Sequence, residues 1–374
     1  MQQIPIFNVS LQHNLFDEAS QGAYNKWKYL ITDKNGKQRH IWIKAGSKPF
    51  GLYNHESIME VIASYLAYDL GLVGTGVEIL QYKPCLLKIK ELDGTIVNSI
   101  GCYSNDFTEQ NGKDIGDEVI NLYDLLHYSS NTLGYKQAIE LVSKKTNGQI
   151  TTQQYRQYLD TTILIDSLIL NQDRHPGNLA IIQNRNTGRY RLSPIFDFGL
   201  GIKGLSNIHE RTPDFEDYLM DDEYRPAKPF SDYFDAQLVL TGFKRNSVEN
   251  AKLRQLGNSF IQKTKTNKCH TSNMLNMLFL YFSSKDEYLP KWNTEQRKKI
   301  DFIRQQMWGK ENWEKGSLVD NPFTLKERDY ILQVIKRRIE VVIFGQPLIE
   351  FGQQATQRLN REIERLLEEE RKVG

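Results

Sequence analysis

The first hundred residues carry short segments in which apolar and polar positions alternate, and this is the period of a β-strand. Two such segments, residues 26–33 and 38–46, flank the dipeptide Asn35-Gly36. An Asn-Gly pair between alternating segments is typical of a β-hairpin. Further strand-like segments follow at residues 76–82, 84–90 and 96–103. Between them, residues 56–71 place apolar side chains at helical spacing and end at a glycine, which predicts one helix.

From about residue 119 onward, apolar residues recur every three or four positions, as they do on one face of a helix. The predicted helices span residues 118–128, 135–145, 152–170, 246–265, 272–284, 294–308 and 325–344. A last amphipathic helix is predicted within residues 351–374. The sequence therefore predicts an α+β protein in which a small β-rich lobe, residues 1–108, precedes a larger helical lobe, residues 109–350.

Length, charge and cysteine content narrow the classes of protein. A chain of 374 residues is long enough for two lobes, because single cores stop growing at roughly 250–300 residues. The 48 basic and 46 acidic side chains give a formal net charge of +2, so no strong field for nucleic acid is expected. The three cysteines have neither CxxC spacing nor paired histidines, which disfavours a zinc site or a disulfide scaffold and suits a reducing compartment.

Neither a secretory signal nor a membrane-spanning segment is evident in the sequence. The first ten residues lack the basic region and the long apolar stretch of a secretory signal. The sequence contains no run near the roughly 18–20 apolar residues that a membrane span needs. We therefore expect a cytoplasmic protein that does not insert into a membrane. Export as a toxin or effector, through another kind of signal, stays open.

The densest polar chemistry lies in residues 171–178, NQDRHPGN, directly after the apolar run TTILIDSLIL. A short strand, a polar turn and a second strand follow, and the chain then reaches Asp197 in a DFG sequence. Phosphoryl transfer from a nucleotide requires a carboxylate near the attacking hydroxyl. It also requires an amide oxygen and a second carboxylate that hold magnesium against the phosphates. The spacing therefore predicts Asp173 as the catalytic base, with Asn178 and Asp197 as metal ligands.

An upstream lysine supplies a candidate contact to the phosphates. Strand alternation places Lys44 on the opposite face from Ile41 and Ile43, at the end of the predicted strand. Glu56 and Glu60 lie four residues apart on one face of the following helix, so the residues alone leave either open as the partner of this lysine. The alternative is an exposed lysine with two solvated glutamates, which the acid–amide–acid set downstream disfavours.

Five segments carry a resemblance to a known family. They are SQGAYNK at residues 20–26, WIKAG at 42–46, ESIMEVIASYLAYDLGL at 56–72, LNQDRHPGN at 170–178 and RLSPIFDFGL at 191–200. In this order they resemble the HipA-like serine/threonine kinases, and in particular their compact, CtkA-like members. The resemblance implies a two-lobed, protein-kinase-like fold and an ATP- and magnesium-dependent serine/threonine protein kinase. It gives Asp173 the role of base and makes Asn178 and Asp197 the metal ligands.

The resemblance also implies a nucleotide site. It favours Glu60 over Glu56 as the helix partner of Lys44. The cofactor-binding residues that it implies for ATP are Ser20, Gly22, Ala23, Lys26 and Lys44 around the phosphates, with Ser104, Asn105 and Phe107 in the hinge strand against adenine. The sequence contains no GxGxxG, so we expect a phosphate loop of a shorter type.

Two other functions stay open. DRHPGN followed by DFG also resembles the phosphoinositide kinases, so a lipid kinase is the alternative enzyme, although no basic amphipathic surface helix is evident. A pseudokinase that acts as a binding scaffold is the alternative of another class, but a scaffold has no physical need for Lys44 beside the acid–amide–acid set. We expect a protein substrate of unidentified nature, no direct contact with nucleic acid, and no extra N-terminal domain as in the longer toxin members. The sequence leaves the oligomeric state open.

Hydroxyl side chains near the expected cleft predict self-phosphorylation. Ser20 belongs to the expected phosphate loop, and the loop-like residues 200–231 follow DFG and carry Ser206, Thr212 and Ser231. A phosphate adds about −1.5 to −2 charges. On the phosphate loop that charge would repel the nucleotide, whereas on the later loop it could pair with an arginine.

Overall fold

The computed structural model describes eleven stretches of the chain. They are residues 4–13, 25–33, 35–48, 52–73, 76–110, 113–126, 134–171, 173–202, 248–266, 268–288 and 292–344. Several predicted features lie outside these stretches: Ser20, Gly22 and Ala23 of the phosphate loop, most of residues 200–231, and the helix expected within 351–374.

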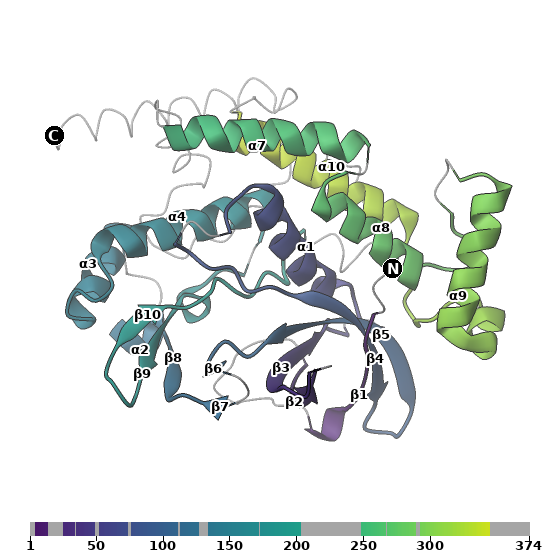
Figure 1. Cartoon of the computed structure of the whole chain (residues 1–374), viewed down its shortest axis with the longest axis horizontal. Coiled ribbons are helices and arrows are strands. Elements are labelled where there is room, and N and C mark those ends of the chain that lie inside the picture. The colour runs from purple at the N-terminus through teal and green to yellow at the C-terminus, as the bar shows by residue number, and fades with distance from the viewer. Residues whose placement is uncertain are drawn as a thin grey trace.

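The N-terminal part of the chain forms a five-stranded sheet in the order β1-β4-β5-β3-β2 (Figure 1). Its strands are β1 Ile6–Ser10, β2 Lys26–Thr32, β3 Gln38–Ala45, β4 Lys83–Lys90 and β5 Ile96–Asn105. Neighbouring strands are antiparallel except β1, which pairs parallel to β4. The sequence pattern did not reveal β1, because its partner strand lies some eighty residues further along the chain.

The β2–β3 hairpin turns at the predicted Asn35-Gly36 pair. Gly36 has a φ of 75°, a left-handed conformation that glycine adopts without a steric penalty. The carboxylate of Asp33 accepts a hydrogen bond from the backbone N–H of Asn35 at 2.8 Å and closes the turn. The resulting register sets Lys26 directly opposite Lys44 on the two strands.

The two faces of the sheet belong to different hydrophobic cores. One face contributes to a small core within the N-terminal region, made of residues such as Trp27, Ile41, Ile43, Leu87 and Ile89. The other face contributes Leu86, Ile100 and Cys102 to a larger core, which continues into the helices of the C-terminal region. Strand alternation thus lets the same strands bury both faces.

Helix α1, Glu56–Asp69, connects the sheet to that larger core. Most of its 14 residues are buried, including the polar Glu60 and Ser64, as expected for a helix covered on all sides. The helix ends where predicted: Gly71 has a φ of 62°, and its N–H donates to the carbonyl oxygen of Tyr68 at 3.0 Å.

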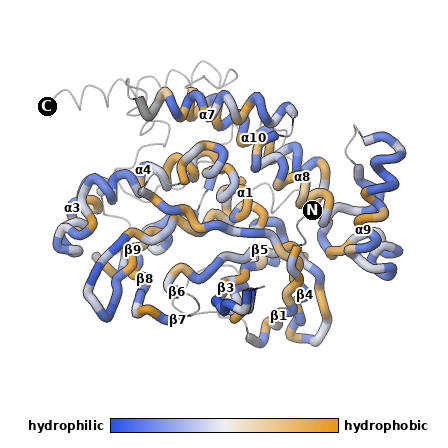
Figure 2. Tube along the Cα trace, viewed as in Figure 1, coloured by the Kyte–Doolittle hydropathy of each residue, from blue (hydrophilic) through white to orange (hydrophobic). Residues whose placement is uncertain are grey.

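The rest of the described chain is mostly helical. The helices are α2 Leu122–Leu126, α3 Tyr135–Lys145, α4 Thr152–Ile169, α7 Val248–Lys265, α8 His270–Phe282, α9 Thr294–Lys315 and α10 Leu325–Val342. In Figure 1, α7, α8 and α10 lie over α1 and the end of α4, and α9 stands at one side. Hydrophobic positions recur at short intervals along these helices in Figure 2, which matches the periodicity that predicted them.

The chain also forms a small second sheet, with its strands in the order β10-β9-β8. Its strands are β8 Asp117–Asn121, β9 Ala180–Asn184 and β10 Tyr190–Leu192, and a short pair, β6 Glu109–Gln110 and β7 Lys113–Asp114, precedes them. The strands β9 and β10 are the predicted pair before Asp197. The helix predicted over residues 118–128 is half wrong, because residues 117–121 pair with β9 and only α2 is helical.

The strand predicted over residues 76–82 is also wrong. Within it, Ile79 forms an isolated parallel bridge with Ile195. The backbone N–H of Leu80 donates to the carbonyl oxygen of Ile195 at 2.9 Å, and the N–H of Ile195 donates to that of Glu78 at 2.8 Å. The alternating apolar residues here form one isolated bridge and no strand. This bridge connects the sheet region to the segment just before Asp197.

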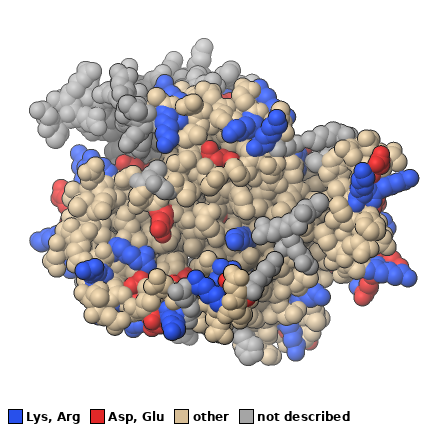
Figure 3. Space-filling model, viewed as in Figure 1, with Lys and Arg blue, Asp and Glu red and all other residues tan. Residues whose placement is uncertain are grey.

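The predicted fold class is confirmed. The chain is an α+β protein with a β-sheet N-terminal region and a helical C-terminal region. The lobe boundary at residues 108–109 stays a prediction. Within the described residues, no helix combines the length and apolarity that crossing a bilayer requires. On the face shown in Figure 3, basic and acidic side chains are interspersed, in line with the nearly balanced charge.

Candidate active site

The loop with the predicted base begins where α4 ends. Thr151 caps the start of α4 by accepting a hydrogen bond from the backbone N–H of Gln154 at 3.2 Å. At the other end Leu170 takes a left-handed conformation, with a φ of 53°, which costs energy for a residue other than glycine. The chain therefore leaves the helix sharply, and the loop that carries Asp173 and Asn178 begins directly at the end of a buried helix.

Two short-range contacts fold this loop. His175 precedes the 3-10 turn Pro176–Asn178, and its Nδ1 accepts a hydrogen bond from the backbone N–H of Gly177 at 3.0 Å. The side-chain amide of Asn178 donates to the carbonyl oxygen of Asp173 at 3.1 Å. This bond fixes the two predicted site residues relative to each other and leaves the amide oxygen of Asn178 as an acceptor.

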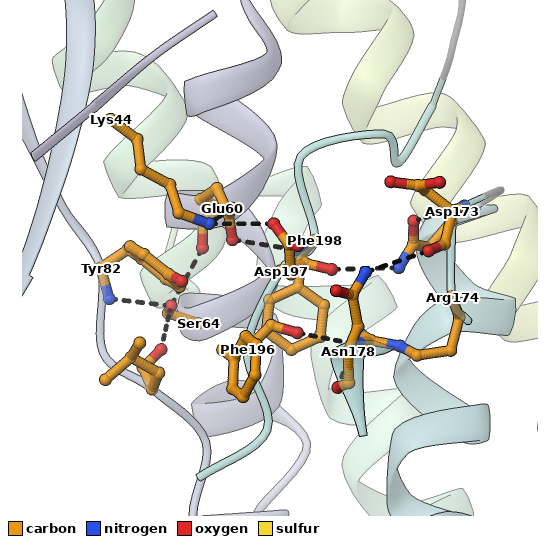
Figure 4. A network of polar contacts seen from close by, with 12 residues as sticks. Lys44, Glu60, Ser64, Tyr82, Asp173, Arg174, Asn178, Phe196, Asp197 and Phe198 are labelled. Carbon is orange, nitrogen blue, oxygen red and sulfur yellow. Dashed lines mark hydrogen bonds and ion pairs between the residues drawn. The ribbon is translucent and has the colours of Figure 1, made fainter. Parts of the chain in front are cut away.

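The opposite wall of the site holds a buried charge cluster (Figure 4). The ammonium Nζ of Lys44, at the end of β3, lies 2.6 Å from Oε1 of Glu60 on α1 and 2.9 Å from Oδ1 of Asp197. The second carboxylate oxygen of Glu60 accepts a hydrogen bond from the backbone N–H of Phe198 at 2.9 Å. In Figure 4, Asp197 lies between the Lys44–Glu60 pair and the loop that carries Asp173.

The ring of Tyr82 and the hydroxyl of Ser64 support this cluster from below. Lys44 Nζ lies 5.2 Å from the centre of the Tyr82 ring. Ser64 Oγ accepts from the backbone N–H of Tyr82 at 3.1 Å and donates to the carbonyl oxygen of Leu80 at 2.9 Å. These bonds attach α1 to the segment that bridges to Ile195.

Glu56 does not contact Lys44. Its carboxylate accepts hydrogen bonds from the backbone N–H of Ser47 at 2.8 Å and from the Ser47 hydroxyl at 3.1 Å. It therefore holds the chain between β3 and α1, while Glu60, one turn later, reaches the lysine. The geometry distinguishes two glutamates that share a helix face in the sequence.

The charges around Asp197 keep its carboxylate ionised. Burial opposes ionisation, but the ammonium groups of Lys44 and Lys26 more than offset it and hold the pKa of Asp197 well below its usual value. Burial also lowers the pKa of Lys26, and the nearby positive charge of Lys44 lowers it further. Asp197 itself has a φ of 66°, an unusual backbone conformation that here coincides with its contact to Lys44.

Asp173 has the opposite environment. Burial and the negative charge of Asp197 raise its pKa. No described residue donates a hydrogen bond to its carboxylate, which stays available as an acceptor. Two carboxylates with divergent pKa values in one site are typical of divided roles, one as a base and one as a charged ligand.

Arg174 is a site residue that the sequence analysis missed. Its guanidinium is buried and donates to both carboxylate oxygens of Asp166 on α4, at 2.8 and 3.0 Å. It also donates to the carbonyl oxygens of Asn178, at 3.2 Å, and Phe196, at 2.6 Å. One side chain therefore connects α4, the loop that carries Asp173 and Asn178, and the residue before Asp197. The available signal was an aspartate inside an apolar run, because a buried charge needs a partner.

The described acid and amide of the site fit magnesium. Magnesium prefers oxygen ligands and binds through one or two carboxylates together with the phosphates of a substrate. An ionised Asp197 and the amide oxygen of Asn178 match that set. A group of three or more His, Cys, Asp or Glu side chains that could hold a metal by themselves is not found within the described stretches.

The predicted hinge residues lie at the end of β5. Ser104 and Asn105 pair with Trp42 and Ile41 of β3, so their backbone is engaged on that side of the strand. The ring of Phe107 stacks on Phe196 at a centroid distance of 6.0 Å. Contact of these residues with adenine stays a prediction.

Comparisons with known proteins find similarity to solved structures only. No protein-family model matches the chain, and no curated protein matches it. Among solved structures, the chain is similar to the proinflammatory kinase CtkA of Helicobacter pylori, with 15% identity, a TM-score of 0.45, and coverage of 90% of this chain and 98% of that one. It is also similar to HipA of Shewanella oneidensis in a complex with HipB and operator DNA, with 13% identity, a TM-score of 0.40, and coverage of 87% and 65%.

A MAP kinase of Leishmania major also matches, with 12% identity, a TM-score of 0.20, and coverage of 90% and 83%. CtkA and HipA are also the proteins whose families the sequence motifs resemble. All three TM-scores are below 0.5, and the function is therefore inferred below from the geometry of the site.

The Arg174–Asp166 pair gives a test of the site's internal support. Arg174→Met would leave Asp166 buried without its partner, so we expect a loss of about 3–5 kcal/mol in the free energy of unfolding. Urea denaturation measures it. The matched control is Arg185→Met, whose pairing with Asp114 is 58% and 69% exposed. That change should cost no more than about 1 kcal/mol. Equal, small losses in both variants would contradict the proposed support.

Proposed function

We propose that this protein is an ATP- and magnesium-dependent serine/threonine protein kinase that also phosphorylates itself. The observation that supports this most directly is the Lys44 ammonium, which contacts both Glu60 on α1 and Asp197 after β10. Kinases use such an arrangement to place a lysine on the phosphates while an acid beside it holds magnesium. A protein without this chemistry gains little from burying three charges at one point.

Each residue has one task in the proposed reaction. Asp173 orients the attacking hydroxyl and takes its proton, because its raised pKa and open carboxylate suit a base. Lys44, held by Glu60, neutralises charge on the phosphates. Asn178 and Asp197 hold magnesium, which when bound stabilises the charge of the transferred group. The hydroxyl oxygen forms a bond to the γ-phosphorus while the bond from that phosphorus to the leaving ADP oxygen breaks.

The substrate class is a protein hydroxyl, and a lipid kinase is the alternative outcome of the test. Purified protein is incubated with labelled ATP and magnesium, with casein-like proteins or phosphoinositide vesicles in separate reactions. We expect label on protein. Label on lipid alone would support a lipid kinase, and label on neither would support a binding scaffold.

The same assay separates the two acids. Asp173→Asn removes the base and should lower turnover by about 10²–10⁴-fold, while magnesium-dependent nucleotide binding is largely kept. Asp197→Asn removes the charged metal ligand and should lower both turnover and that binding. Isothermal titration with magnesium and a non-hydrolysable ATP analogue measures the binding. Wild-type turnover in either variant would remove the role assigned to that residue.

The lysine–glutamate pair is tested by a double-mutant cycle on turnover. Lys44→Met and Glu60→Gln should each lower turnover, and the double variant should lose less than the two losses combined, by about 0.5–3 kcal/mol. Glu56→Gln is the matched control, because Glu56 lies one turn earlier and binds Ser47. Strict additivity with Glu60, or coupling of Lys44 to Glu56, would contradict the pairing as a catalytic unit.

Self-phosphorylation is expected on serine or threonine. Candidate hydroxyls are Ser20, Ser206, Thr212 and Ser231, all of which lie outside the described residues. Mass spectrometry after incubation with magnesium and ATP should find phosphate on the wild-type protein and none on Asp173→Asn. Equal modification of the variant, or an unmodified wild type, would overturn this expectation.

A further inference from the structure

The helix that carries Glu60 is attached to the C-terminal helices at both of its ends. Helix α1 packs mainly against α8, and it shares the larger hydrophobic core with α4, α8 and α10. In Figure 1 the helix lies between the N-terminal sheet and these C-terminal helices. The position of Glu60 therefore depends on residues more than two hundred positions further along the chain.

The N-terminal end of α1 is held by a buried imidazole. His55 directly precedes the helix, and its Nδ1 lies 2.6 Å from Oε1 of Glu327 in the first turn of α10. Its Nε2 lies 3.1 Å from the backbone carbonyl oxygen of Asn321. Both His55 and Glu327 are 1% exposed, so water does not screen the pair.

The partners of the ring fix how many protons the His55–Glu327 pair holds. A carbonyl oxygen only accepts, so Nε2 must carry a hydrogen, and the carboxylate on the other side also requires a proton in the contact with Nδ1. The second oxygen of Glu327 accepts from the backbone N–H and the hydroxyl of Thr324, both at 2.7 Å. The pair thus keeps a proton that a free histidine loses near neutral pH.

Neighbouring bonds join the same surfaces. The side-chain amide of Asn321 donates to the carbonyl oxygen of Tyr53 at 2.9 Å. Asp320 accepts a hydrogen bond from the backbone N–H of Asn98 on β5 at 2.6 Å, and its own N–H donates to the carbonyl oxygen of Asn98 at 2.9 Å. The segment before α10 therefore binds the chain at Tyr53, just before His55, and at Asn98 on β5.

The C-terminal end of α1 has a second attachment. The carboxylate of Asp69 accepts from the backbone N–H groups of His270 and Thr271, at 3.0 and 2.8 Å, where α8 begins. The Thr271 hydroxyl donates to it at 2.7 Å, and Nδ1 of the largely exposed His270 lies 2.8 Å away. An acid here also favours the positive end of the α8 dipole.

We propose that His55 is a positioning residue for the phosphoryl transfer proposed above. Its buried bridge to Glu327 and Asn321 holds α1 where Glu60 reaches Lys44. The inference rests on the proposed function for its catalytic consequence, but the attachment of α1 is a structural statement that can be tested alone. His55 lies five residues before Glu60, about 7.5 Å along a helix axis, so movement at one point is transmitted to the other.

The bridge should depend on pH. Burial lowers the pKa of His55, but the charge of Glu327 and the two hydrogen bonds more than offset it, so the pKa is raised. Burial raises the pKa of Glu327, and His55 and Thr324 more than offset that and lower it. Glu327 is the described charged group that acts on His55, and Glu287 in turn lies near Glu327.

The sign follows from these two directions. The contribution of His55 to stability is complete below the unfolded pKa, about 6.5, and is lost as the pH rises through the higher folded pKa. The contribution of Glu327 is present above about 4.3 and is lost as the pH falls through its lower folded pKa. The difference in urea stability between wild type and His55→Gln should therefore shrink as the pH rises from about 6 to about 9.

The decisive experiment uses hydrogen exchange and kinetics on the full chain. The variants are His55→Gln and Glu327→Gln. The second keeps an oxygen for the Thr324 cap, so it serves if the first does not fold. The matched control is His270→Gln, which removes an exposed imidazole while three other donors to Asp69 remain. We expect faster exchange of the amides in residues 56–69 in both bridge variants and no change in the control.

Turnover gives the second measurement. Each bridge variant should lower kcat by about tenfold in the wild-type background and have no further effect in a Glu60→Gln background. Unchanged exchange in residues 56–69, or equal losses of kcat in both backgrounds, would overturn the inference. If the wild type transfers no phosphate, the proposed function fails, and hydrogen exchange still decides whether His55 holds α1.

Discussion

The buried positive charge of Lys44 is the constraint on which the rest of the site depends. A desolvated ammonium is costly unless opposite charges and hydrogen bonds surround it, and Lys44 has Glu60 and Asp197 at bonding distance. These three residues come from a strand, a helix and the loop after a second sheet. Burying this lysine therefore brings the sheet, α1 and the DFG segment together.

The remaining site contacts hold the segments around Lys44, Glu60 and Asp197 in place. Leu170 and Asp197 accept left-handed backbone conformations, which are costly for such residues and persist only where surrounding contacts enforce them. Arg174 supplies part of that enforcement, because its guanidinium binds Asp166 and the carbonyl oxygen of Phe196 at once. The strain of the backbone and the buried network around Arg174 are thus two aspects of one structure, in which packing stabilises local geometry that the chain alone would avoid.

Sequence reasoning reached the parts of this structure that local patterns encode. The Asn35-Gly36 hairpin, the end of α1 near Gly71 and the acid–amide–acid set all follow from turn chemistry, periodicity or spacing. It missed β1, and it predicted a helix over 118–128 where the first residues form β8. In both places, strand pairing with distant partners overrides local preference. It also missed Arg174, since nothing in the spacing shows that an aspartate eight residues earlier faces it. The choice of Glu60 over Glu56 came from family resemblance, and geometry gives its reason.

The long-range attachment of α1 shows why those misses matter for function. His55 and Glu327 are 272 residues apart in the chain, and neither belongs to the motifs that mark the candidate site. Yet a helix that shares its core with α8 and α10 cannot shift without disturbing them, because cores are close-packed. The C-terminal helices therefore help to set the position of Glu60, and Glu60 in turn holds the ammonium group of Lys44. Stability and the geometry of the candidate site are consequently linked, because a change that loosens the packing of α8 or α10 reaches Lys44 through α1 and Glu60.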